Sequence, residues 1–129
     1  MMIKLLAISL GGMIGALLRY GVGGAIHRLT STTFPVGTMF INLTGCLIIG
    51  LLWGLFERFN FSSLLRSFLF IGVLGSYTTF SSLGLETFSL FRDGEARLGL
   101  YNVLITNTFG ILLVFGGYFA VRWLLNLTK

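Results

Sequence analysis

The chain has 129 residues, of which 55% are hydrophobic and only 10% are charged, with a mean hydropathy of +0.93 and a formal net charge of +5. A typical soluble domain has about 25% charged residues, and an apolar surface of this extent would aggregate in water. The composition therefore excludes an ordinary soluble domain and predicts a membrane protein, in which each crossing helix needs about 20 apolar residues.

Four apolar stretches follow one another along the chain, and we expect them to form a single all-α domain of four transmembrane helices. The stretches cover approximately residues 5–26, 36–56, 68–91 and 98–121. A basic residue before an apolar run also opens a secretory signal, but the apolar core of a signal is only about 7 to 15 residues long. The first stretch is longer and three more follow it, which favours a crossing over a signal.

Basic residues are divided almost evenly between the two sides of the predicted bundle. An even number of crossings puts both termini on one side. The residues on that side are Lys4, Arg58, Arg66, Arg122 and Lys129, and those toward the other side are Arg19, Arg28, Arg92 and Arg97. Because an excess of Lys and Arg on the cytoplasmic side sets orientation, this near balance favours insertion in both directions. We hypothesise dual topology and an antiparallel homodimer, with a single weakly biased orientation as the alternative.

The distribution of the basic residues indicates which classes of partner the chain binds. The small number of Cys and His residues restricts metal binding. The basic residues are scattered singly, whereas proteins that bind nucleic acid cluster them. We therefore expect anionic lipid headgroups or an anionic solute as partners, and no nucleic acid. Cys46 and His27 are the single members of their kinds, so one chain has neither a disulfide framework nor a paired thiolate metal site.

Glycines four residues apart predict where helices pack closely. Gly11 with Gly15, and Gly50 with Gly54, form GxxxG patterns that let helix backbones approach each other in lipid. Arg19 is on the same helical face as Gly11 and Gly15 and is expected to face protein rather than lipid. It is either an interfacial anchor or a fixed positive charge in an aqueous vestibule.

Two crossings carry a stripe of polar and small residues along one helical face. The stripes consist of Thr38, Asn42 and Cys46 in the second crossing, and of Asn102, Thr106 and Gly110 in the fourth. Asn and Thr can hold helices together by hydrogen bonds, which is the simpler interpretation for any one of them. Two stripes in one small chain favour a polar track lined by uncharged donors.

The third crossing combines glycines with a run of hydroxyl residues at mid-membrane, between Gly72 and Ser82. Glycine and threonine lower helix propensity, and hydroxyls compete for the backbone, so we expect a broken helix near residues 75–80. Freed carbonyls at membrane depth must be satisfied by protein or must line a cavity or an ion. A kink satisfied by Ser and Thr is the alternative.

The polar residues within the crossings favour a small anion as the permeant. Glu86 is the one acidic residue within the four stretches, whereas cation and proton pathways use intramembrane acids. The remaining candidates are Arg, Asn, Thr and Ser donors and the ring edge of Phe80, which carries positive quadrupole.

Three segments resemble a known family. They are GGMIGALLRY at residues 11–20, GTMFINLTG at 37–45 and GSYTTFS at 75–81. With these segments the chain resembles the Fluc-type (CrcB-like) family of small dual-topology fluoride channels, over all four crossings. The resemblance implies an antiparallel dimer with two pores that exports fluoride passively through the plasma membrane of a prokaryote. It also implies a structural sodium ion at the dimer centre.

The resemblance further implies roles for individual residues. Asn42 would donate a hydrogen bond to fluoride, and Phe80 would offer its ring edge to the ion. Arg19 would lie near the vestibule, and the backbone carbonyls of Gly75 and Thr78 would bind sodium. The other polar positions implied for the pathway are Thr38, Thr79, Ser81, Glu86, Asn102 and Thr106.

The chain departs from the family pattern at residue 83, where the family has a second phenylalanine and this sequence has Leu83. Either Phe80 acts alone or Leu83 shapes the pore. Two other functions remain open, a proton-coupled multidrug exporter and a structural membrane subunit. The lack of an acid in the first crossing disfavours the exporter. An enzyme is disfavoured because the sequence offers no nucleophile, base and orienting group that could act together.

Overall fold

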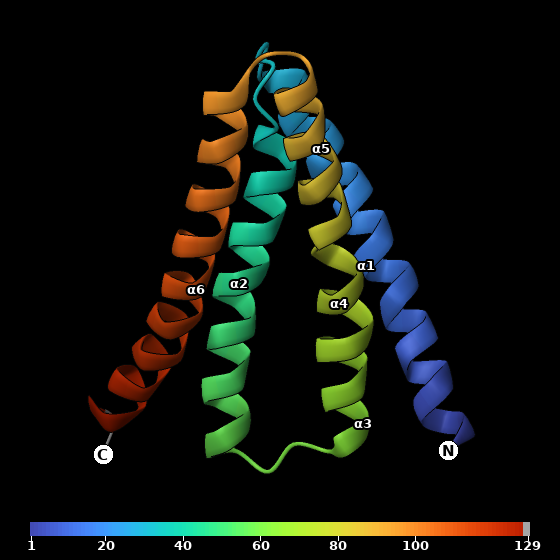
Figure 1. The fold of residues 1–129 in the computed structure, drawn as a ribbon. Coiled ribbons are helices and arrows are strands. Elements are labelled where there is room, and N and C mark those ends of the chain that lie inside the picture. The colour runs from blue at the N-terminus through green and yellow to red at the C-terminus, as the bar shows by residue number, and fades with distance from the viewer. Residues whose placement is uncertain (128–129) are drawn as a thin grey trace.

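The computed structural model describes residues 1–127 and is helical throughout, apart from short connections (Figure 1). Four helical segments are long and apolar enough to cross a membrane, as predicted. They are α1 (Met2–Leu29), α2 (Val36–Arg58), a third segment over Ser63–Arg92, and α6 (Ala96–Leu127). Both chain ends lie at one end of the bundle (Figure 1). Lys129, counted above with the basic residues on that side, lies outside the described residues.

The third crossing is not one continuous helix. It consists of α3 (Ser63–Arg66), the π-helix η1 (Ser67–Leu74), α4 (Gly75–Tyr77) and α5 (Phe80–Arg92). Between α4 and α5 the backbone is extended, with φ −79° and ψ 157° at Thr78 and φ −152° and ψ 114° at Thr79. The predicted break is confirmed, and it occupies these two threonines. The π-helical turns before it were not predicted.

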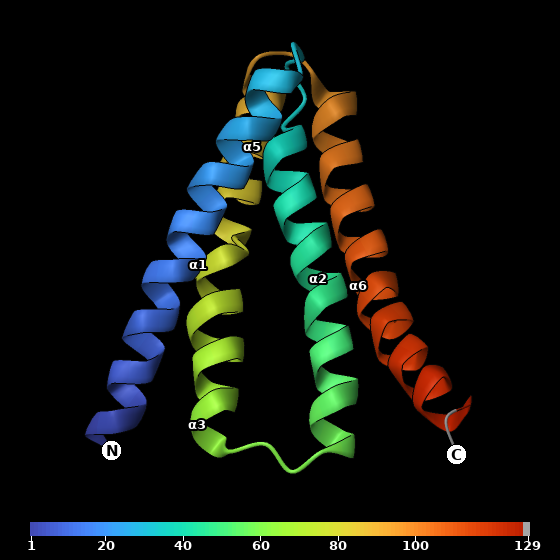
Figure 2. The ribbon, with the colours of Figure 1, turned by 180° about the vertical axis from the view of Figure 1, so that it is seen from behind.

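The helices pack as two pairs that converge at the end away from the termini (Figures 1 and 2). The first pair joins α1 to η1 and α4, and the second joins α2 to α6, while α5 also packs on α6. The convergence brings the break in the third crossing beside α2.

Glycines lie at the closest approaches within both pairs, as their spacing predicted. A Cβ on Gly11 would lie 2.5 Å from the carbonyl oxygen of Phe68, and one on Gly15 would overlap the carbonyl of Val73. In the other pair, a Cβ on Gly50 would overlap the carbonyl of Val114. Substitution at these positions would therefore force the paired backbones apart.

Few apolar side chains are fully buried in a single chain. Ile41, Leu74 and Leu83 are among the buried ones, whereas large apolar residues are exposed along most of α1 and α6. Such a surface requires lipid or another protein surface around it.

Candidate functional site

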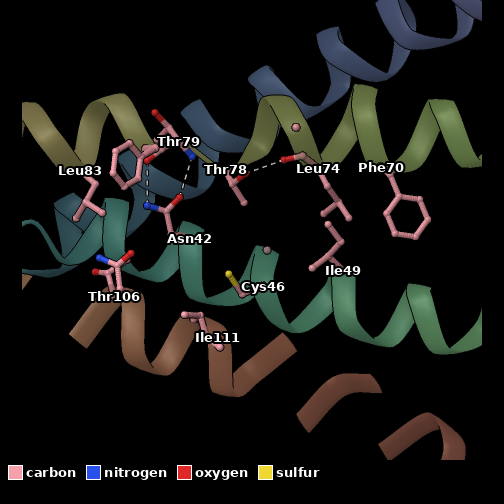
Figure 3. Close-up of a pocket in the computed structure, with 15 residues that line it drawn as sticks. Asn42, Cys46, Ile49, Phe70, Leu74, Thr78, Thr79, Leu83, Thr106 and Ile111 are labelled. Atoms are coloured by element: carbon pink, nitrogen blue, oxygen red, sulfur yellow. Dashed lines mark hydrogen bonds between the residues drawn. The ribbon is translucent and has the colours of Figure 1, made fainter. Parts of the chain in front are cut away.

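A hollow of about 300 Å³ lies between α2, the third crossing and α6 (Figure 3). Its polar groups gather around the break in the third crossing, and the rest of its wall is mainly apolar. The lining residues are Asn42, Gly45, Cys46 and Ile49 of α2; Phe70, Leu74, Gly75, Thr78, Thr79, Phe80 and Leu83 of the third crossing; and Thr106, Asn107, Gly110 and Ile111 of α6.

Asn42 connects α2 to the break. Its Nδ2 donates to the carbonyl oxygen of Thr79 at 3.0 Å, and its Oδ1 accepts from the backbone N–H of Thr79 at 2.8 Å (Figure 3). Both residues are 8% exposed. The second N–H of this amide makes no hydrogen bond within residues 1–127, so Asn42 supports the break and retains one donor.

The break also leaves main-chain carbonyls without their helical partners. The N–H of Thr79, which would bond the Gly75 carbonyl in a continuous helix, bonds Asn42 instead. The carbonyl of Thr78 accepts no hydrogen bond from any described residue, whereas the N–H and hydroxyl of Thr78 both donate to Leu74 at 3.0 Å. Gly75 and Thr78 both line the hollow, and their carbonyls lack the donors that a continuous helix would supply.

The other half of the break starts a new helix. The hydroxyl of Thr79 accepts from the N–H of Ser82 at 3.2 Å and caps the amino end of α5. The same hydroxyl lies 3.2 Å from Ser81 Oγ. The positive end of the α5 dipole thus begins beside the hollow.

Three further predicted residues line the hollow with different exposures. Phe80 is 78% exposed in the single chain, so its ring is almost uncovered. Leu83 is 4% exposed and forms part of the packed wall one turn later. Thr106 is 6% exposed, and its hydroxyl has no hydrogen-bond partner among the described residues.

The remaining predicted residues lie outside the lining. Thr38 Oγ1 donates to Glu86 Oε1 at 2.5 Å, and the other carboxylate oxygen of Glu86 is buried without a partner in the described part of the chain. Asn102 is fully buried; its Nδ2 donates to Thr87 Oγ1 at 3.1 Å. Ser81 is exposed, and Arg19 on α1 is partly exposed, away from the hollow.

Two residues that the sequence pattern did not assign to the site line the hollow or lie beside the break. Asn107 lines the hollow although it is not in the predicted stripe. Tyr77 is buried, and its hydroxyl lies 3.0 Å from Thr44 Oγ1, which adds a second link between α2 and the third crossing. No sequence pattern indicated the contact between Thr44 and Tyr77, because the two residues are 33 positions apart.

Comparison with known proteins identifies the family. The model of the CrcB-like proteins, described as Camphor Resistance (CrcB), matches residues 6–118, which include Asn42 and the whole break. The chain belongs to the CrcB-like family. The resemblance drawn from the three sequence segments is thereby confirmed.

Curated relatives match this CrcB-like protein over nearly its whole length. One from Parabacteroides distasonis is 40% identical over 99% of this chain and 100% of the relative. One from Salinibacter ruber is 46% identical over 97% of this chain and 94% of the relative. One from Solibacter usitatus is 43% identical over 92% of this chain and 98% of the relative. Each of the three is named a fluoride-specific ion channel, FluC.

Proposed function

We propose that this CrcB-like protein is a fluoride-specific ion channel. The observation that carries the proposal is the match, over nearly the full length, to bacterial relatives that bear this name. The arrangement around Asn42 supports the same conclusion, because it gathers donors without net charge beside an apolar wall. Such a channel conducts passively and carries no enzymatic chemistry.

The hollow supplies the groups that a dehydrated fluoride ion needs. The free N–H of Asn42 and the hydroxyl of Thr106 donate hydrogen bonds to the ion, and Phe80 presents its positive ring edge. The amino end of α5 adds a partial positive charge. Leu83 forms part of the apolar wall that limits the space, so residue 83 offers no second ring edge beside that of Phe80.

Residues beyond the hollow prepare the approach of the ion. Arg19 attracts fluoride at the vestibule, and Thr38 and Ser81 provide polar lining along the pathway. Asn102 is fully buried in the single chain, where it links α6 to α5 through Thr87. Glu86 is held by Thr38, and its other carboxylate oxygen is buried without a partner in the described part of the chain, so we assign Glu86 to the support of the pathway. The direction of net flow is export from the cytoplasm down the electrochemical gradient.

The functional unit is an antiparallel homodimer with two pores. The division of basic residues, five against four, gives little preference for one orientation. Phe80 and Gly75 are exposed at the break in a single chain, and a second copy would cover them. Tags on the carboxyl terminus test this arrangement: we expect them on both sides of the membrane, and finding them on one side only would refute it.

A sodium ion at the dimer centre fits the carbonyls of the break. Gly75 and Thr78 have lost their helical donors, and hard cations bind oxygen ligands of this kind. When bound, sodium supplies positive charge that joins the two broken helices. The carbonyl pairs of the two copies would hold it. Stability of the purified dimer should therefore fall when sodium is replaced by a large organic cation.

Fluoride efflux from liposomes containing only the purified protein tests the function. We expect rapid efflux without a proton gradient and little passage of chloride. Efflux that needs a proton gradient would instead support an exporter. Efflux equal to that of protein-free vesicles, or equal passage of chloride, would refute the proposal.

A further inference from the structure

A second pocket lies between the carboxyl ends of α2 and α6, far from the break. It has a volume of about 270 Å³ and is lined by Gly54, Glu57, Arg58, Arg122, Leu125 and Asn126. Its position is the end of the bundle where both chain termini lie (Figure 1). Since α2 and α6 are membrane-spanning helices, their ends meet the headgroup layer of one leaflet.

The aromatic residues beside this pocket are typical of that layer. Trp53 Nε1 donates to Glu57 Oε1 at 3.0 Å, and the hydroxyl of Tyr118 donates to Glu57 Oε2 at 2.6 Å. The guanidinium of Arg66 lies 5.4 Å from the centre of the Trp53 ring. Trp and Tyr are enriched at membrane interfaces, where an apolar ring and a polar tip are both satisfied.

The contacts of the carboxylate leave the pocket with surplus positive charge. Both oxygens of Glu57 accept from neutral donors, and neither Arg58 nor Arg122 forms an ion pair within residues 1–127. Arg122 uses one N–H to bond the Tyr118 hydroxyl at 2.9 Å, and Arg58 makes no hydrogen bond in the described part of the chain. Two guanidinium groups therefore face one carboxylate, which leaves one positive charge.

We propose that this pocket binds the phosphate of an anionic phospholipid headgroup. A guanidinium has donors in a planar fork that matches phosphate oxygens, and two such groups line the same pocket. Both oxygens of Glu57 already accept hydrogen bonds from Trp53 and Tyr118, so the donors of Arg58 remain available to a phosphate although the carboxylate cancels one of the two positive charges. Leu125 supplies an apolar contact at the rim of the pocket for the part of the lipid that leads from the headgroup to the acyl chains.

Native mass spectrometry of the full chain, released from micelles that contain either phosphatidylglycerol or phosphatidylcholine, tests the proposal. We expect the protein to retain phosphatidylglycerol in preference. Arg58→Gln and Arg122→Gln should each lower retention about fivefold, as expected for one basic residue near an anionic headgroup. Arg58→Gln is the decisive variant because it breaks no hydrogen bond. Arg97→Gln, at an exposed position at the other end of α6, is the matched control and should retain the lipid fully.

Three outcomes would overturn this site. Equal retention of the two lipids would show that the charge of the headgroup is not recognised. If Arg58→Gln retained phosphatidylglycerol as well as the wild type, or if Arg97→Gln lost it equally, the lipid would not be bound by this pocket. Displacement of the lipid by inorganic phosphate as effectively as by short-chain phosphatidylglycerol would mean that the pocket takes a free anion instead.

Discussion

Asn42 and Thr79 hold each other through two hydrogen bonds, in which the side-chain amide of one replaces the main-chain partner of the other. The two residues are 37 positions apart and are both buried, at a point where the third crossing has no helical hydrogen bonds. An unpaired main-chain group in this apolar setting would be costly. Asn42 therefore stabilises the break, and the break in turn positions the remaining N–H of Asn42 at the hollow.

Asn42→Asp tests the two N–H donors of the Asn42 amide, one of which bonds the Thr79 carbonyl and one of which is free for the ion. Asn42→Asp keeps an acceptor for the Thr79 N–H but loses the donor and adds a negative charge. We expect fluoride efflux from liposomes, followed with a fluoride electrode, to fall at least tenfold, since one unsatisfied buried group costs about 1 to 3 kcal/mol. Asn60→Asp, in the exposed connection after α2, makes the same chemical change and should leave efflux unchanged. Normal efflux in Asn42→Asp would contradict the role assigned to this residue.

Phe80→Ile tests the ring edge at the hollow. Because Phe80 is 78% exposed in the chain, isoleucine should fold normally while it removes the positive edge of the ring. We expect a loss of fluoride efflux of roughly tenfold or more, from about 1.4 kcal/mol of lost stabilisation of the ion. Phe88→Ile, on the same helix and also exposed, is the control and should conduct normally. Similar rates in the two variants would argue against a contact between the ring and the ion.

Thr106→Val tests a buried hydroxyl that has no partner among the described residues. Valine has nearly the same shape, so the melting temperature should stay the same or rise, because an unsatisfied polar group is removed. Efflux should nevertheless fall severalfold if the hydroxyl donates to the ion. Thr87→Val is expected to have the opposite effect on stability. It removes the acceptor of Asn102 Nδ2 and should lower the free energy of unfolding by about 1 to 3 kcal/mol. If Thr106→Val were stable and conducted fluoride at the wild-type rate, the Thr106 hydroxyl would not donate to the ion.

The sequence was sufficient to predict the crossings, the glycine contacts and the break, because each depends on local composition or spacing. Hydropathy marked the four helices, and the run from Gly75 to Ser81 marked the place where helical bonding fails. The pairing of Asn42 with Thr79 was beyond reach, since it depends on how α2 and the third crossing approach each other. The partners of Glu86 and Asn102 could not be predicted for the same reason. The helical stripes placed Asn42 on one face of its crossing and Asn102 with Thr106 on one face of theirs, and the structure shows that all three are buried.

Gly15→Ala should disrupt the pair formed by α1 and the third crossing. An added Cβ would overlap the carbonyl of Val73, and a backbone carbonyl cannot move aside as a flexible side chain can. We expect the free energy of unfolding to fall by about 1 to 3 kcal/mol, the usual cost of overpacking. Gly24→Ala is the matched control, because nothing lies within 4 Å of a Cβ at that position on the same helix. Alanine favours helix over glycine, so this control should be as stable as the parent or more stable. The fraction of protein that stays monodisperse in detergent after heating measures the difference, and equal melting of the two variants would contradict the close packing of α1 against η1.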